Sequence, residues 1–395
     1  MPGIMFATGI ENSYPTIAGG QRVDEMDKCG HYAHWKEDLQ LVHDMGIHFL
    51  RWGPAIYKTF TGPGQYDWDW TDGVMAEMQG LEIHPIIDLC HFGVPDWIGN
   101  FQNADFPHYF AEYASAFAKR YPHVKYWTPI NEMLITTTFS AKYGWWNEME
   151  TTDEAYVRAT LNVSRASTMA MKAITEHIAD AVFIQSESSE YTHPSRPNLE
   201  DAAVFYNERR FLCLDLAYGH DVSAQMYRYL TQHGMTKDDY DYFMNEHERY
   251  RCILGTDYYT LNEHVLETDG TTLSAGEIFG YYVITRQYHE RYRLPVMHTE
   301  TNIAEHQGAV HWLWKEWSCM LQLRRDGIPI VGFTWYSLTD QMDWDTALRE
   351  DARRVNPVGL YDLDRKLRKV GEHYRHLIGQ WGEILPSGSK ALMLV

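Results

Sequence analysis

The chain has 395 residues, of which 45% are hydrophobic, so it can bury a large core in one domain or in several. Its 34 basic and 54 acidic side chains give a formal net charge of −20, which repels polyanions and argues against a nucleic-acid partner. A neutral small molecule fits this charge balance better.

The five cysteines are odd in number, widely scattered and never spaced as C-x-x-C, which argues against a disulfide framework or a zinc–thiolate site. The N-terminus lacks a basic region followed by a long apolar stretch, and no run reaches the ~20 apolar residues of a membrane span. We therefore expect reduced thiols, a cytoplasmic location and no membrane partner. A homo-oligomer is compatible with the sequence.

Short apolar runs alternate with longer amphipathic segments along the chain, without a low-complexity linker, which favours a single domain over residues 1–395. The apolar runs predict eight buried strands at 4–8, 47–52, 83–89, 124–130, 181–186, 252–258, 294–299 and 330–336. Apolar residues at three- and four-residue spacing predict helices at 35–45, 106–121, 153–177, 276–292 and 306–325. This alternation predicts an α/β fold, a (β/α)8 TIM barrel.

The segment 187–251 follows the fifth predicted strand and is too long for a simple βα unit. We expect it to be an extended insertion of extra helices over one rim of the barrel.

Two glutamates follow predicted strands. Glu132 comes after the run 124–130, and Glu300 comes directly after the run 294–299. Because the strands of such a barrel end at one face, the fold can bring the two carboxylates together. A pair of carboxylates is the arrangement that cleaves glycosidic bonds, although either segment alone indicates only a strand end.

The other strand ends also carry polar or aromatic groups, as expected of the catalytic face of a barrel. The candidates are Glu11, Asn12, Arg51, Asp88, His91, Asn131, Glu187, Glu190, Asp257, Tyr259, Tyr336, Asp340, Asp343 and Trp344. For Asp88, Glu187 and Asp340, a buried structural role is an equally good interpretation.

Several motifs resemble those of the family 1 glycoside hydrolases, the β-glucosidase family of retaining barrel glycosidases. The similar segments are Asn131-Glu132, Thr299-Glu300-Thr301-Asn302, the run 253–260, the run 332–344 and Gly359-Leu360-Tyr361-Asp362. The resemblance covers most of the chain.

This resemblance implies that Glu132 is the general acid and base and that Glu300 is the nucleophile of a retaining, cofactor-free and metal-free β-glycosidase. Arg51 and Tyr259 are the groups that could keep the nucleophile charged. The residues expected to contact a small carbohydrate substrate are His91, Asn131, Glu187, Glu190, Trp145, Tyr336, Asp343 and Trp344. A glucoside- or galactoside-like glycone is the expected substrate class.

The chain departs from the family pattern at positions that affect specificity. Asp343 stands where the family has a glutamate, Tyr336 stands where a tryptophan is usual, and the run 9–15 lacks the family's glutamine. The serine and lysine that read phosphorylated sugars in one subgroup are missing, although Arg349, Arg353 and Arg354 could take their place.

Two other classes of function stay open. A metal-dependent barrel such as a sugar isomerase would draw its ligands from His91, Glu187, Asp257, His264 and His298, although no H-x-H or H-E-x-x-H motif supports it. A catalytically inactive glycan-binding barrel would require one of the two glutamates to lie outside the site.

Overall fold

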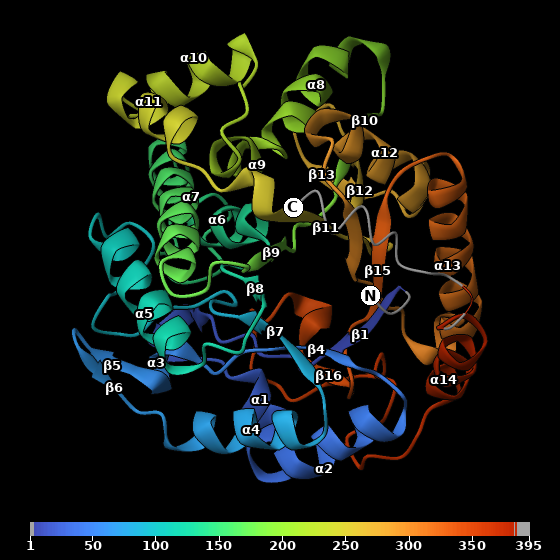
Figure 1. Ribbon diagram of the computed structural model, residues 1–395. Coiled ribbons are helices and arrows are strands. Elements are labelled where there is room, and N and C mark those ends of the chain that lie inside the picture. The colour runs from blue at the N-terminus through green and yellow to red at the C-terminus, as the bar shows by residue number, and fades with distance from the viewer. Residues whose placement is uncertain (1–3, 383, 385–395) are drawn as a thin grey trace.

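Eight parallel strands close into a barrel in the computed structural model, which describes residues 4–382 and 384 (Figure 1). The order around the barrel is β1-β15-β14-β11-β9-β8-β7-β4, and β4 pairs with β1. The strands are β1 (Met5–Gly9), β4 (Phe49–Trp52), β7 (His84–Asp88), β8 (Tyr126–Thr128), β9 (Val182–Gln185), β11 (Cys252–Asp257), β14 (Val296–Glu300) and β15 (Ile330–Trp335). All eight predicted strands are confirmed, with bounds that differ by at most two residues.

Helices surround the barrel (Figure 1). They are α1 (Glu25–Lys28), α2 (His31–Asp44), α3 (Ile56–Thr59), α4 (Asp69–Gly80), α5 (Phe106–Arg120), α6 (Met133–Ala141), α7 (Asp153–Thr175), α8 (Glu200–Arg209), α9 (Leu212–Ala217), α10 (Ala224–Gln232), α11 (Lys237–Asn245), α12 (Gly280–Tyr292), α13 (Ala309–Arg325) and α14 (Lys369–Trp381). The five predicted helices correspond to α2, α5, α7, α12 and α13, whereas α1, α3, α4, α6 and α14 were not predicted.

The segment 187–251 carries α8 to α11, which lie together on one side of the barrel in Figure 1. It also contributes β10 (Tyr191–Pro194) to a small sheet with β12 (Glu263–Leu266) and β13 (Thr272–Ser274). Three two-stranded sheets complete the fold: β2 (Thr16–Ile17) with β3 (Gln21–Arg22), β5 (Phe60–Gly62) with β6 (Gln65–Tyr66), and β16 (Gln341–Met342) with β17 (Val355–Asn356).

Strand alternation places polar side chains inside the catalytic end of the barrel. A buried cluster that includes Ile86, Tyr126 and Ile184 packs between the strands. Side chains two residues further along a strand point the same way. The next inward positions are therefore Asp88 and Thr128 at the ends of β7 and β8, and Ser186 directly after β9. Asp257 lies four residues after Ile253 of the same cluster, and Arg51 lies two residues after the adjoining Phe49. The apolar side chains inside the barrel are thus followed by polar side chains at the carboxyl ends of the strands.

All five cysteines are unpaired, in agreement with the sequence interpretation. Among the described residues, no helix is both long and apolar enough to cross a membrane.

Candidate active site

Glu132 and Glu300 line one cavity of 760 Å³ at the carboxyl ends of the strands. Of the other predicted site residues, six also line it: His91, Trp145, Glu190, Tyr259, Tyr336 and Trp344. Four do not belong to its lining: Arg51, Asn131, Glu187 and Asp343. The structure therefore brings the two glutamates together and divides the remaining candidates into a lining and a supporting layer.

Both oxygens of Glu300 have a donor. Oε1 accepts a charge-assisted hydrogen bond from Arg51 Nη1, and Oε2 accepts one from the Tyr259 hydroxyl at 2.7 Å. The Glu300 side chain is only 5% exposed. A buried carboxylate needs such donors to remain ionised, so both predicted supporting residues occupy positions from which they can hold it.

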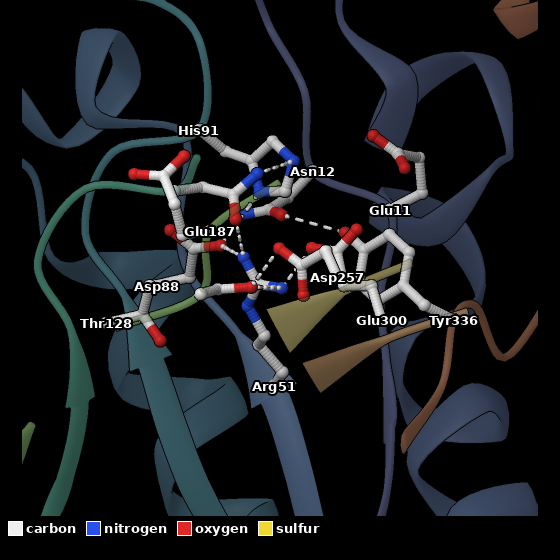
Figure 2. A network of polar contacts seen from close by, with 12 residues as sticks. Glu11, Asn12, Arg51, Asp88, His91, Thr128, Glu187, Asp257, Glu300 and Tyr336 are labelled. Atoms are coloured by element: carbon white, nitrogen blue, oxygen red, sulfur yellow. Dashed lines mark hydrogen bonds and ion pairs between the residues drawn. The ribbon is translucent and has the colours of Figure 1, made fainter. Parts of the chain in front are cut away.

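Arg51 is the hub of a polar network beneath the cavity (Figure 2). Nη2 donates to Asp88 Oδ2 at 2.9 Å and also to Asn131 Oδ1. Asp88 Oδ2 lies 2.7 Å from His91 Nδ1, and His91 Nε2 lies 3.0 Å from Asn131 Nδ2. Each side chain thus fixes the orientation of the next, and His91 presents its ring to the cavity.

Asp257 adds a third buried carboxyl to the site. One oxygen from each of Glu132, Asp257 and Glu300 lies within 4.8 Å of the others. Asp257 Oδ2 accepts from Ser186 Oγ at 2.6 Å, and Ser186 Oγ accepts from Arg51 Nη1 at 2.9 Å. Burial, and then the charge of Glu300, raise the pKa of Asp257 well above its ordinary value. The register irregularity between β11 and β14 places Asp257 opposite Glu300.

Glu132 is held by its backbone. It precedes α6 in a left-handed conformation with φ 36°, which an L-residue rarely adopts, and its N–H donates to Ser186 O at 3.0 Å. Burial, and then the charges of Glu300 and Asp257, raise the pKa of Glu132 well above the usual range. This environment favours the protonated form of the carboxyl, which is the form that a general acid requires.

Asp343 was predicted to contact the sugar, but it lies outside the cavity lining with its side chain fully buried. Its carboxylate accepts from Lys28 Nζ at 2.6 Å and from the backbone N–H groups of Ala352, Arg353 and Arg354. Burial raises the pKa of Asp343, but Lys28 and these donors outweigh it, so the pKa is lowered. Asp343 is thus placed to hold the loop that follows β16.

Glu187 and Asn131 also lie beneath the cavity surface. Glu187 Oε1 accepts from the backbone N–H groups of Leu134 and Ser188, at 3.0 and 3.2 Å. Burial raises the pKa of Glu187 well above its usual value, which favours the neutral form of its carboxyl. Their positions fit structural support better than direct contact with a sugar.

Glu11 and Gln341 are cavity-lining groups that the predicted site did not include. Glu11 Oε2 accepts from Gln341 Nε2 at 3.1 Å, while Oε1 accepts from the Ser13 N–H at 3.0 Å. Glu11 was noted only as a strand-end group. The sequence did not indicate this pair, because the two residues lie far apart along the chain and meet only in the folded barrel.

Aromatic rings form the outer walls of the cavity. The Tyr336 ring lies stacked on His91 with centroids 6.2 Å apart, and a Cβ on Gly9 would come within 2.2 Å of it. Glycine is therefore required at position 9. On another wall, Trp145 packs on Phe139 with centroids 4.6 Å apart.

The five residues named for a metal site do not converge. His298 is fully buried, stacks on Tyr281 and does not line the cavity, whereas His264 lies beside Glu190 at 3.6 Å. Among the described residues, the three carboxyls of the site form the one group close enough to share an ion. Glu300 of that group forms an ion pair with Arg51. The group is therefore part of a charged network, and it differs from the ligand set considered from the sequence.

The sequence model of glycosyl hydrolase family 1 matches residues 13–275 of this chain. The chain belongs to glycosyl hydrolase family 1. Curated relatives include beta-glucosidase A of Thermotoga maritima, which is 22% identical over 360 residues that cover 80% of this chain and 79% of that protein. The 6-phospho-beta-glucosidase AscB of Escherichia coli is 22% identical over 415 residues, covering 90% of this chain and 85% of that protein.

The fold of this family 1 hydrolase matches solved structures. The beta-glucosidase of Thermotoga maritima in complex with glucoimidazole aligns with a TM-score of 0.81 at 19% identity, covering 97% of this chain and 99% of that chain. The barrel prediction and the family resemblance are both confirmed.

Proposed function

We propose that this family 1 enzyme hydrolyses a small β-linked glycoside with retention, using Glu300 as the nucleophile and Glu132 as the acid and base. The observation that carries the assignment is that carboxyl oxygens of the two residues lie within 4.8 Å in one cavity. Retaining glycosidases hold their two carboxyl groups about 5–5.5 Å apart, whereas inverting enzymes leave about 6.5–9.5 Å for a water molecule.

The two environments support different roles. Glu300 is oriented by the hydrogen bonds from Arg51 and Tyr259, so one of its oxygens can attack the anomeric carbon. Glu132 carries no hydrogen bond to its carboxyl from the described residues, and its raised pKa keeps a proton ready for the leaving oxygen. Formation of the glycosyl ester removes the charge of Glu300, which lowers the pKa of Glu132 and lets it activate water.

We propose an uncharged glycone, contacted by Glu11, His91, Gln341 and Trp344. Two of the three arginines that could have read a phosphorylated sugar have partners within the protein. Arg354 pairs with Asp345 and Glu350 at 2.8 and 2.9 Å, and Arg349 Nε donates to Thr346 O. The sugar and its linkage are to be identified by assay, and self-association stays a prediction.

The test uses nitrophenyl glycosides of differing sugar and anomeric configuration, with and without EDTA. We expect hydrolysis of a β-glycoside that is insensitive to EDTA, and covalent labelling of Glu300 by the matching 2-fluoro sugar. The Glu300→Gly variant should lose activity and regain it with azide, giving an inverted glycosyl azide.

Other outcomes would favour the remaining alternatives. Activity that EDTA abolishes and that survives the Glu300→Gly change would indicate a metal-dependent reaction. Binding of a glycan without turnover or label would indicate an inactive barrel.

A further inference from the structure

Arg209, the last residue of α8, reaches the wall of the active-site cavity from the 187–251 segment. The residue is 92% buried, since its relative exposure is 8%, yet it belongs to the lining. Its guanidinium lies among aromatic rings, with the central carbon 4.7 Å from the Tyr206 centroid, 5.5 Å from Tyr156 and 6.0 Å from Phe205. A permanent positive charge is therefore held at the cavity surface.

Arg209 has no acidic partner. Within residues 4–382 and 384, no carboxylate forms an ion pair with it and no oxygen accepts a hydrogen bond from its side chain. The other arginine beside it, Arg210, donates to Asn207 O at 3.1 Å, to Gln287 Oε1 at 2.6 Å and to Glu190 O. The carboxylate of Glu190 instead lies 3.6 Å from His264.

This isolation is unlike the environment of other buried arginines in the molecule. Arg51 binds the carboxylate of Asp88, and Arg210 has the three oxygen acceptors given above. The half-buried Arg291 and Arg365 bind the carboxylates of Asp215 and Asp38. Arginine stays charged at any working pH and carries five donors, so a buried guanidinium without an acceptor is costly. Its donors are available to an anionic group that enters the cavity.

Arg209 lies on the leaving-group side of the proposed reaction. Glu132, the proposed acid, delivers its proton on the side where the leaving group departs. The helix that begins after Glu132 lines the cavity through Leu134, Ile135, Thr138 and Phe139. Phe139 stacks on Tyr143 with ring centroids 5.8 Å apart, and Tyr143 is an electrostatic neighbour of Arg209. The proposed glycone contacts are different lining residues, contributed by other strand ends.

This wall is aromatic, and among the described residues Arg209 is its one arginine without a hydrogen-bond acceptor. Arg210 and Arg349 also line the cavity, but both donate to oxygen acceptors. Phe139, Tyr143, Trp145 and Tyr206 all line it, and such rings favour a flat aromatic group. A carboxylate matches the planar fork of a guanidinium and can accept two parallel hydrogen bonds from it.

We propose that Arg209 is a specificity residue that binds the carboxylate of an aromatic leaving group, so that the preferred substrates are glycosides of aryl acids. This inference rests on the proposed glycosidase function. The negative net charge of the chain disfavours acidic ligands in general, so the preference has to come from this local site.

The test compares para-carboxyphenyl and para-carbamoylphenyl glycosides of the sugar found in the nitrophenyl screen. The ratio of their kcat/KM values is measured in the wild type, in Arg209→Gln and in Arg349→Gln. The second variant also removes one positive charge from the cavity lining, but Arg349 lies over Trp145. The comparison between variants cancels the intrinsic difference in leaving-group reactivity.

We expect Arg209→Gln to lower the acid-to-amide ratio by about 10- to 150-fold, the range for a hydrogen bond to a charged group, and Arg349→Gln to change it less than about threefold. Equal effects of the two variants, or an unchanged ratio in Arg209→Gln, would overturn the assignment while leaving the glycosidase intact. If no neutral glycoside is hydrolysed by the wild type, the proposed function itself fails, and this inference with it.

A second measurement does not depend on folding of the variant. On the wild type, para-hydroxybenzoate should inhibit hydrolysis of the neutral glycoside at least about 10-fold more tightly than para-hydroxybenzamide, and added salt should weaken that inhibition. Equal inhibition by the two compounds would count against the proposal.

Discussion

Tyr259 and Tyr258 are adjacent residues whose hydroxyls each donate to a buried carboxylate. Tyr259 donates to Glu300 at 2.7 Å, and Tyr258 donates to Glu263 at 2.8 Å. Burial, and then the charge of Glu300, keep the pKa of Tyr259 well above its ordinary value, so this donor stays protonated. Replacing Tyr259 with Phe leaves Oε2 of Glu300 without a donor among the described residues.

A hydrogen bond to a charged group contributes about 1.5–3 kcal/mol. If Tyr259 holds the nucleophile in its reactive orientation, its loss should lower kcat/KM by about 10- to 150-fold, because each 1.36 kcal/mol corresponds to a factor of about ten. Glu263 keeps the backbone N–H groups of Phe279 and Gly280 as donors when Tyr258 is changed. Tyr258→Phe should therefore cost about 1 kcal/mol of stability and leave kcat/KM within about twofold.

The assay is steady-state kinetics on an activated aryl glycoside for the wild type and both variants, with thermal unfolding of each. The expected pattern is a large loss of kcat/KM in Tyr259→Phe alone. A loss smaller than about threefold in Tyr259→Phe, or an equal loss in both variants, would refute the view that this hydroxyl positions the nucleophile.

Three further outcomes are expected. Glu132→Ala should retain the glycosylation step on dinitrophenyl glycosides but turn over slowly, and azide should speed it by giving a retained glycosyl azide; unchanged turnover on poor leaving groups would contradict the acid role. Glu300→Gln should lower the pKa of Glu132, because the charge of Glu300 is the largest raising influence after burial; a carbon-13 titration with Glu132→Gln as the reference checks this, and a rise would be inconsistent. Because burial raises the pKa of Glu187, its protonated carboxyl contributes to the stability of the fold below the pKa of an unfolded glutamate, about 4.3. That contribution is lost as the pH rises towards the pKa of the folded state. Glu187→Gln should thus show a shallower fall of Tm from about pH 5 to pH 8 than the wild type, and parallel curves would count against it.

The barrel was predictable because its strands are buried on both sides and form continuous apolar runs. Helix α4 was missed although Val74, Met75 and Met78 are buried, because few apolar residues mark its inner face and glycines lie at positions 73 and 80. Helix α14 was missed although Val370, Tyr374 and Leu377 have helical spacing.

The candidate site was predictable where a strand end dictates direction, as for Arg51. The site was not predictable for residues in loops, because the sequence does not show where a loop side chain points. An aspartate there can contact a sugar or, like Asp343, accept hydrogen bonds from neighbouring backbone N–H groups. Arg209 was missed for a related reason: an arginine in a long helical insertion usually lies on the surface, and only its burial without a carboxylate distinguishes it.

The hydrogen bonds that Lys28 and three backbone N–H groups donate to Asp343 have a consequence for exchanging loops between related enzymes. Lys28, at the end of α1, pairs with Asp343 and also with Glu25 at 3.1 Å. These ion pairs tie the loop after β16 to α1, near the start of the chain. A loop exchanged without its lysine would bury an unneutralised carboxylate, and lengthening Asp343 to glutamate would disturb three backbone hydrogen bonds. An exchange of the loop after β16 should therefore include the segment of α1 that carries Lys28.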